Sequence, residues 1–194
     1  MSYFFIPKKI KSFFDLIRLN KPTGFLLLMW PCWFALAITP INYIENIKWF
    51  LFFFIGSFLM RSAGCIVNDI IDINIDNKTL RTSQRPLVAK TVKIYEACIL
   101  LIILLILSFL ILLQFNSEAI LIGCFSIPLI FIYPFMKRFT HWPQLVLGIT
   151  FNWGVLIVST QFNDFILIQY VLLYLACIFW TLGYDTIYAY QDRL

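Results

Sequence analysis

The sequence predicts an all-α fold, a multi-spanning bundle of transmembrane helices, and two observations support this prediction. Of the 194 residues, 61% are hydrophobic and only 13% are charged, whereas ordinary soluble domains have roughly 25% charged residues. Six apolar stretches are each long enough for a helix that crosses a bilayer core, which takes about 20 residues. Strands of a membrane barrel alternate in polarity, and runs such as 99–113 do not. We therefore expect about six membrane-spanning helices.

The expected spans follow one another along the chain with short connections. The fourth and fifth are the weakest, because they are short and carry Pro128, Pro134 and Gln144. The six cover about residues 23–40, 47–67, 94–114, 119–136, 144–161 and 165–184. No soluble domain or linker interrupts them, so the sequence predicts a single membrane domain over residues 1–194.

Residues 1–22 precede the first span and are expected to lie at the cytoplasmic membrane surface. Ile10, Phe13, Phe14 and Ile17 recur at helical spacing, with basic residues between them, which is typical of an interfacial helix. The charged residues of this segment interrupt any apolar region that a signal peptide would need. A basic flank that only sets the orientation of the chain is the alternative.

The distribution of positive charge predicts the topology. With the N-terminus in the cytoplasm, all the lysines and arginines fall in cytoplasmic segments except Lys48, on the far side, and Arg61, inside the second span. The net charge of +5 is then explained by contact with anionic lipid or an anionic substrate. We expect no nucleic-acid partner. The five cysteines form no CxxC pair, which argues against a metal or disulfide role for them.

An acidic run that follows the second span is the strongest functional signal. Asp69, Asp72 and Asp76 are three and four residues apart, so on a helix they would lie within roughly 60° of one another on one face. Mg²⁺ binds carboxylate oxygens and keeps room for phosphate oxygens and waters. With Asn68, the run predicts a magnesium site for a diphosphate. A solvated loop is an alternative, and a calcium loop is disfavoured because Asn77 stands where a glycine is required.

Three arginines around this run are candidates for binding an anion. Arg81 and Arg85 follow it and can each make bidentate contacts to phosphate oxygens. Arg61 lies within an apolar span, where a charge is costly and usually faces the interior of the bundle. It precedes Asn68 by about two helical turns, so one helix face can present both. The alternatives are charges that orient the chain and, for Arg61, a side chain that reaches the membrane surface.

A second polar cluster follows the fourth span. Tyr133 and Lys137 are four residues apart and can share a helix face, and Arg138 is next to them. A phenol and cations at the cytoplasmic mouth suit the shielding of a carbocation and the binding of a diphosphate. An interfacial belt of aromatic and basic residues is the alternative. His141 has no partner cluster, and we do not assign it as a base.

A third polar cluster ends the chain. Asp185 and Asp192 are seven residues apart, on one helix face with Tyr188 between them. This cluster follows the sixth span on the side where the first acidic run lies. Two acidic clusters on one membrane side could hold two Mg²⁺ ions across one diphosphate.

Taken together, these motifs resemble the UbiA superfamily of intramembrane prenyltransferases. The Asn-Asp-x-x-Asp-x-x-x-Asp pattern at residues 68–76 marks the superfamily, and five other segments strengthen the resemblance. They are residues 18–24 with Trp30 and Pro31, residues 61–67, residues 81–87 and residues 133–148, together with residues 184–192 at the end of the chain.

The resemblance implies a Mg²⁺-dependent reaction. Asn68, Asp72 and Asp76 would hold one ion and Asp185 and Asp192 a second, and the ions would bind a polyprenyl diphosphate. Asp69 is a further candidate ligand. The most similar branch transfers the polyprenyl group to the ring of 4-hydroxybenzoate in ubiquinone biosynthesis. The resemblance also implies an active site on the cytoplasmic side of a bacterial inner membrane, or a site in the mitochondrial inner membrane.

The chain departs from the superfamily in length. Members usually have about nine spans. Six spans of about 20 residues each, together with their loops, already account for the 194 residues of this chain. We therefore expect a fragment, a shortened product, or a partner chain that completes the bundle. The alternatives are another prenyl transfer in the haem or menaquinone pathway, an inactive remnant, and a membrane carrier, which would need facing charges at mid-bilayer.

Overall fold

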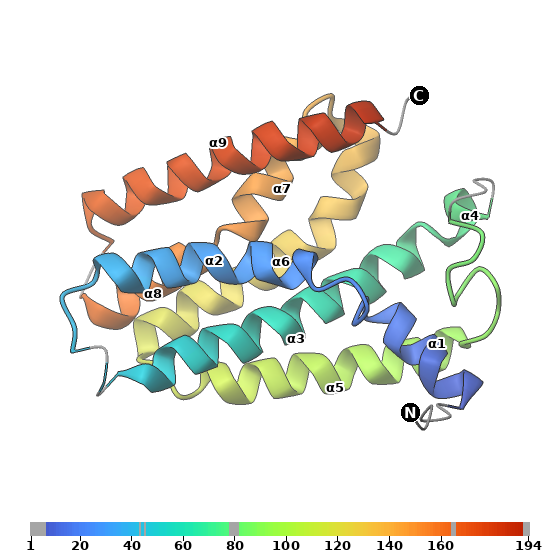
Figure 1. Cartoon of the computed structure of the whole chain (residues 1–194), viewed down its shortest axis with the longest axis horizontal. Coiled ribbons are helices and arrows are strands. Elements are labelled where there is room, and N and C mark those ends of the chain that lie inside the picture. The colour runs from blue at the N-terminus through green and yellow to red at the C-terminus, as the bar shows by residue number, and fades with distance from the viewer. Residues whose placement is uncertain (1–6, 43, 45, 78–81, 164–165, 192–194) are drawn as a thin grey trace, which may run out of the picture.

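The computed structural model describes residues 7–42, 44, 46–77, 82–163 and 166–191, and the side chains of these except Lys137, Arg138 and Gln191. The described residues form nine helices and no strand (Figure 1). In chain order they are α1 (Lys8–Leu16), α2 (Thr23–Ile38), α3 (Ile47–Ile71), α4 (Ile73–Asp76), α5 (Ile94–Leu112), α6 (Ser117–Phe139), α7 (Pro143–Phe151), α8 (Gly154–Phe162) and α9 (Ile168–Gln191).

The long helices form the expected bundle. α3 packs against α2 and α5, α6 packs against α7 and α8, and α9 packs mainly against α7 (Figure 1). Among the described residues, five helical stretches are long and apolar enough to cross a membrane, with α7 and α8 taken together as one of them, and α2 is a shorter apolar helix. The prediction of an all-α, multi-spanning membrane protein is confirmed.

The structure changes two of the expected spans. The second continues past residue 67 to Ile71, so the start of the acidic run is part of α3. The fifth is interrupted, because the helix stops after Phe151 and resumes at Gly154. At the interruption, the buried Asn152 amide donates to the Gly148 carbonyl at 2.7 Å and to Thr181 Oγ1 on α9 at 3.0 Å. These bonds supply the polar partners that irregular backbone at membrane depth requires.

Helix α6 is continuous despite its two prolines. The Asn116 side chain caps its first turn by accepting a hydrogen bond from the Ala119 amide at 2.8 Å. Pro128 and Pro134 lie inside the helix, and a proline removes one backbone donor and clashes with the preceding turn. Such prolines are tolerated in membrane helices because neighbouring groups satisfy the carbonyls that lose their partner. The helix therefore extends to Phe139 and carries Tyr133 on its last turns.

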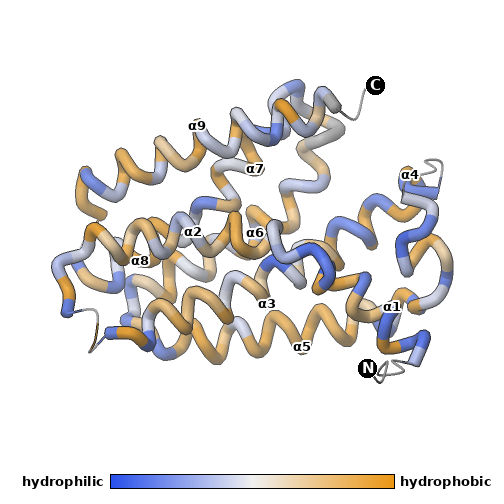
Figure 2. The backbone as a smooth tube through the Cα atoms, viewed as in Figure 1, coloured by the Kyte–Doolittle hydropathy of each residue, from blue (hydrophilic) through white to orange (hydrophobic). Residues whose placement is uncertain are grey.

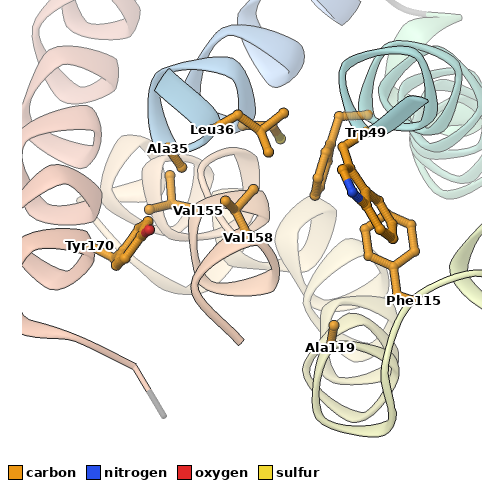
Figure 3. Packing of buried hydrophobic residues seen from close by; sticks show 10 residues of the cluster. Ala35, Leu36, Trp49, Phe115, Ala119, Val155, Val158 and Tyr170 are labelled. Carbon is orange, nitrogen blue, oxygen red and sulfur yellow. The ribbon is translucent and has the colours of Figure 1, made fainter. Parts of the chain in front are cut away.

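Two groups of buried apolar residues hold the bundle together. The first joins α2, α3, α8 and α9 at one end of the bundle and includes Leu36, Trp49, Val158 and Tyr170 (Figure 3). The second packs α1 and the connection between α4 and α5 against α3 and α5. Leu87 and Val92, both nearly fully buried, fix that connection. The polar segments around the acidic run are thus attached to a packed core.

The outward surface of the bundle is apolar. Helix α5 is hydrophobic over most of its length (Figure 2), and only 11% of its apolar stretch is buried inside the protein. The hydrophilic residues gather at the end of the bundle that carries α1 and α4 (Figure 2). An apolar outer surface of this kind matches a hydrocarbon environment, and the chain is an integral membrane protein. The position of α1 at a membrane surface stays a prediction.

Candidate functional site

A cavity of about 530 Å³ lies inside the bundle, lined by residues of α2, α3, α5, α6, α7, α8 and α9. Along α3, its wall extends from Phe52 to Asp69, which at 1.5 Å per residue is a length of about 25 Å. Apolar side chains such as Phe53, Phe115 and Ile157 line one part of it. The other part is polar, and its lining includes Arg18, Arg61, Asn68, Arg85, Tyr133, Tyr184, Asp185 and Tyr188. The cavity is therefore amphipathic along its length.

The acidic run lies at the polar end but does not form one helical stripe. α3 ends at Ile71, Asp72 forms the junction, and α4 begins at Ile73. The expectation of a continuous helix through Asp76 is therefore wrong. The three aspartates are also buried, with 1% of Asp69, 9% of Asp72 and 6% of Asp76 exposed. Buried carboxylates need partners that compensate their charge, and the structure supplies guanidinium groups for two of them.

Arginine side chains form ion pairs with Asp69 and Asp76. Both carboxylate oxygens of Asp69 accept hydrogen bonds from Nη2 of Arg18, at 2.8 and 2.9 Å, and Oδ1 also accepts one from Nη1 of Arg85 at 3.0 Å. Nη1 of Arg85 donates to Asp76 Oδ2 as well, at 2.5 Å. Arg85, predicted to bind phosphate, is thus held by two aspartates. Arg18 was not predicted as a site residue, although it opens one of the segments of the superfamily resemblance.

Arg61 is a partly buried cation at the polar end with an incomplete set of hydrogen-bond partners among the described residues. Its Nε is buried and has no hydrogen-bond partner in the described part of the chain. Its guanidinium lies over the ring of Phe151, 5.3 Å from the centroid, a cation–π contact that offsets only part of the cost of burial. The backbone of Gly24 passes so close that a Cβ there would be 2.6 Å from Nε. The sequence did not indicate that Gly24 and Phe151 contact Arg61, because these contacts form only when the helices pack together.

Helices α6 and α9 supply the opposite wall. Tyr133, Tyr184, Asp185 and Tyr188 all line the cavity. Tyr133 lies within electrostatic range of Arg61, Asp72 and Asp185. The structure thus brings together residues of the first acidic run and the third polar cluster, which are more than a hundred positions apart in the sequence.

Several predicted residues lie outside what the structure describes. Arg81 and Asp192 are not among the described residues, and neither are the side chains of Lys137 and Arg138. Within the described part of the chain, no three histidine, cysteine or acidic side chains converge as a metal-binding group. The roles predicted for the site residues therefore stay predictions.

The fold and the cavity define a class of protein: an integral membrane helical bundle that encloses a long amphipathic chamber with cations, carboxylates and phenols at one end. Comparison with known proteins identifies the family. The UbiA prenyltransferase family matches residues 28–194, and the chain belongs to this family.

Relatives of this chain occur in bacteria and in eukaryotes. It is 42% identical over 185 residues to the 4-hydroxybenzoate octaprenyltransferase of Vibrio cholerae, covering 95% of this chain and 65% of that protein. It is 43% identical to the mitochondrial 4-hydroxybenzoate polyprenyltransferase of Caenorhabditis elegans, covering 96% of this chain and 53% of that protein. The chain thus spans about two thirds, or less, of the length of these relatives.

Two solved structures share the fold. A UbiA homologue from Aeropyrum pernix K1 superposes with a TM-score of 0.69 at 24% identity, over 96% of this chain and 66% of that one. A structure of digeranylgeranylglyceryl phosphate synthase superposes with a TM-score of 0.72 at 23% identity, over 96% and 64%. At this identity the similarity supports the fold of the bundle.

Proposed function

We propose that this chain carries the active site of a prenyl transfer in ubiquinone biosynthesis, in which a polyprenyl group moves from its diphosphate to the ring of 4-hydroxybenzoate. The names of its bacterial and mitochondrial relatives support this acceptor and this donor. The observation that carries the proposal is the cavity itself, because its apolar and polar parts match a lipid-like chain that ends in a charged group.

The apolar part of the cavity is the proposed site of the prenyl chain. Its wall includes Leu27, Phe53, Leu112 and Ile157 from four different helices. Burial of hydrocarbon against such side chains contributes about 25 cal/mol for each Å² removed from water. The same walls keep water from the reaction centre, where water would quench an allylic cation.

Arg61 is the proposed partner of the acceptor's carboxylate. A buried guanidinium that lacks a hydrogen-bond partner on Nε is costly unless an anion joins it. An arginine and a carboxylate pair in a bidentate geometry that also fixes the orientation of the ring. Tyr133, within electrostatic range of Arg61, can face the developing cation with its ring.

The polar end offers oxygen ligands suited to Mg²⁺. Asn68 and Asp185 line the cavity from α3 and α9, and Asp72 lies within electrostatic range of the same tyrosine as Asp185. This set of hard oxygen donors is the type that Mg²⁺ prefers. We propose that these residues hold the ion, with Asp76 and Asp192 completing the two clusters. Bound there, Mg²⁺ would stabilise the negative charge of the leaving diphosphate.

The remaining polar residues are assigned by charge. Arg81, Arg85, Lys137, Arg138 and Tyr188 are proposed to bind the diphosphate or the acceptor, and the bases would neutralise phosphate oxygens. We also propose that the polar end faces the cytoplasm, because most of the basic residues lie in segments on that side. The membrane is then a bacterial or mitochondrial inner membrane, in line with the names of the relatives. A partner chain that completes the bundle is part of this proposal.

The test is an assay in membranes that contain the chain, supplied with Mg²⁺, a long-chain polyprenyl diphosphate and 4-hydroxybenzoate. We expect prenylated hydroxybenzoate from the unmodified chain and none from Asp72→Ala. Glu118→Gln is the matched control and is expected to retain full turnover, because Glu118 lies in the first turn of α6, at the other end of that helix from Tyr133. Turnover that appears only when the remaining third of a relative is added would show that a partner segment is needed. Turnover with a haem or naphthoate acceptor alone would contradict the proposed acceptor.

A further inference from the structure

Four charged side chains form a continuous network at the polar end of the cavity. Asp69 accepts hydrogen bonds from Arg18 and Arg85, and Arg85 also pairs with Asp76. The four come from four segments: Arg18 follows α1, Asp69 is in the last turn of α3, Asp76 ends α4, and Arg85 lies in the connection that leads to α5. Two carboxylates meet two guanidinium groups, so the charges within the network balance.

The network stands between two chambers. Arg18 and Arg85 line the 530 Å³ cavity and also a second, polar pocket of about 360 Å³. The second pocket lies on the outer side, among residues of the two polar connections: Asp15, Asn20, Lys21, Thr82, Gln84 and Pro86. The ion pairs that join Arg18 and Arg85 through Asp69 therefore form part of the wall between this outer pocket and the inner cavity.

Two contacts hold the side chain of Arg18. Its φ of 58° belongs to the end of α1, where the Arg18 amide donates to the Asp15 carbonyl at 3.2 Å and the Leu19 amide donates to the Phe14 carbonyl at 2.9 Å, as in a Schellman motif. Nη1 of the Arg18 side chain donates to the Asp15 carbonyl at 2.8 Å, and Nη2 donates to Asp69. Loss of the Asp69 carboxylate removes the second of these contacts, which is the ion pair at the cavity.

The lone pairs of Asp69 are largely committed to these contacts. An ionised carboxylate has about four acceptor positions, and three guanidinium hydrogen bonds fill most of them in a side chain that is 1% exposed. A metal ion at Asp69 would have to displace both arginines. Asp69 lines the cavity as Asn68 and Asp185 do, but both of its carboxylate oxygens are engaged by the two arginines.

We propose that Asp69 is a positioning residue that closes the polar end of the cavity through Arg18 and Arg85, and that it is not a ligand of the metal. This inference rests on the proposed function, since a closed polar end would protect a reactive cation from water. It assigns different tasks to the two neighbours in the Asn68-Asp69 pair: Asn68 is a proposed ligand of the ion, and Asp69 holds the two arginines in place.

Cys65 provides a direct readout of closure. It lies one turn before Asp69 on α3, lines the cavity and is 5% exposed. The protein, in lipid nanodiscs and without substrate, is treated with a charged, water-soluble methanethiosulfonate, and mass spectrometry measures the modification rate at each cysteine. We expect Asp69→Asn to raise the rate at Cys65 by about tenfold or more, because breaking a buried ion pair promotes local opening. Asp69→Glu keeps the carboxylate and is expected to stay closer to the wild-type rate.

The three cysteines that do not line the cavity and a surface ion pair are the controls. Cys98, Cys124 and Cys177 do not line the cavity, and their rates should not change. Glu96→Gln breaks the exposed pair between Lys9 and Glu96 and should leave Cys65 unreactive. An unchanged rate at Cys65 in Asp69→Asn, a fast rate in the wild type, or an equal rise at all five cysteines would each overturn the proposal. If Asp69→Asn does not fold, Arg18→Gln decides the question by the same criteria.

The labelling needs no turnover, so it separates this proposal from the proposed function. An inactive chain whose Cys65 becomes reactive in Asp69→Asn would support the closure and leave the reaction in doubt. Where turnover is measurable, the Mg²⁺ concentration for half-maximal activity gives a second readout. Replacing a residue that only orients a metal site also weakens metal binding, by about 10- to 100-fold, so Asp69→Asn is compared with Arg18→Gln. We expect the two variants to shift this concentration by a similar factor, and a much larger shift in Asp69→Asn would contradict the proposal.

Discussion

The two ends of the bundle bury polar groups in different ways. At the end that contains the first group of buried apolar residues, which includes Tyr170 (Figure 3), the hydroxyls of Thr39 and Tyr170 bond to each other at 2.9 Å. At the polar end, Arg61 leaves its buried Nε without a partner in the described residues. The Thr39–Tyr170 pair is complete without a ligand, whereas Arg61 is not.

This difference separates residues that stabilise the fold from residues that await a substrate. A buried polar group that is fully hydrogen-bonded contributes to stability, and one that lacks a partner costs free energy. A protein keeps such a group where binding of a ligand later satisfies it. Substitutions at the two ends should therefore affect different quantities: activity at the polar end and unfolding at the apolar end.

Among the substitutions that test this comparison between the two ends, the largest effect is expected at Arg61. Replacing it in Arg61→Ala removes the proposed charge-assisted hydrogen bonds to the acceptor, each of which is worth about 1.5–3 kcal/mol. We expect the KM for 4-hydroxybenzoate to rise by about 10- to 100-fold, because 1.4 kcal/mol corresponds to a factor of ten. Steady-state kinetics in nanodiscs, with the acceptor concentration varied, measures this change.

The thermal stability of Arg61→Ala sharpens the comparison. Removal of a buried charge that has an incomplete set of partners should leave the Tm unchanged or raise it. Arg61→Lys is the matched control, because it keeps the charge but loses the bidentate geometry. A Tm that falls sharply, with an unchanged KM, would show that Arg61 serves the fold and not the substrate.

The sequence was sufficient to predict much of this arrangement. Apolar length predicted the spans, and the position of Arg61 inside an apolar stretch predicted that it faces the interior, as the structure has it. The pairing of Asp69 with Arg18, 51 positions earlier, could not be predicted. Helical spacing shows which face a side chain occupies, but the partner on another helix depends on tertiary packing.

The break between α7 and α8 is a second feature beyond the reach of the sequence. The 20 residues from Pro143 to Phe162 have the length and hydropathy of one span. At the break, the buried side chain of Asn152 donates a hydrogen bond to Thr181, 29 positions later. A hydropathy pattern contains no information about such a contact.

A smaller effect is expected where α2 and α8 approach each other closely. A Cβ at position 154 would be 2.3 Å from Sγ of Cys32, so Gly154→Ala forces that side chain or the helices to move. Overpacking of a core costs about 1–3 kcal/mol, and we expect a lower Tm. Because Gly154 and Cys32 also line the cavity at its apolar part, only the KM for 4-hydroxybenzoate is expected to stay unchanged. Thermal unfolding in detergent, followed by circular dichroism, measures the Tm.

The control for this prediction is a double variant. Cys32→Ala removes the sulfur atom that the new methyl group would meet, so Cys32→Ala with Gly154→Ala should recover most of the lost stability. The coupling between the two changes should reach about 0.5 kcal/mol or more, as expected for residues in contact. Additive effects would show that the close approach is relieved elsewhere.

The smallest effect is expected at Tyr170. Tyr170→Phe keeps the ring in its fully buried place and removes the hydroxyl that bonds to Thr39. The loss of one such bond costs about 1 kcal/mol. The Thr39 hydroxyl keeps the hydrogen bond that it donates to the Ala35 carbonyl at 2.8 Å, so the cost should be smaller than for a hydroxyl left with no bond. We expect a slightly lower Tm and unchanged turnover, measured on the same preparation. A Tyr170→Phe variant that keeps its Tm but loses activity would contradict the division between the two ends, because it would place a functional coupling at the end that is complete without substrate.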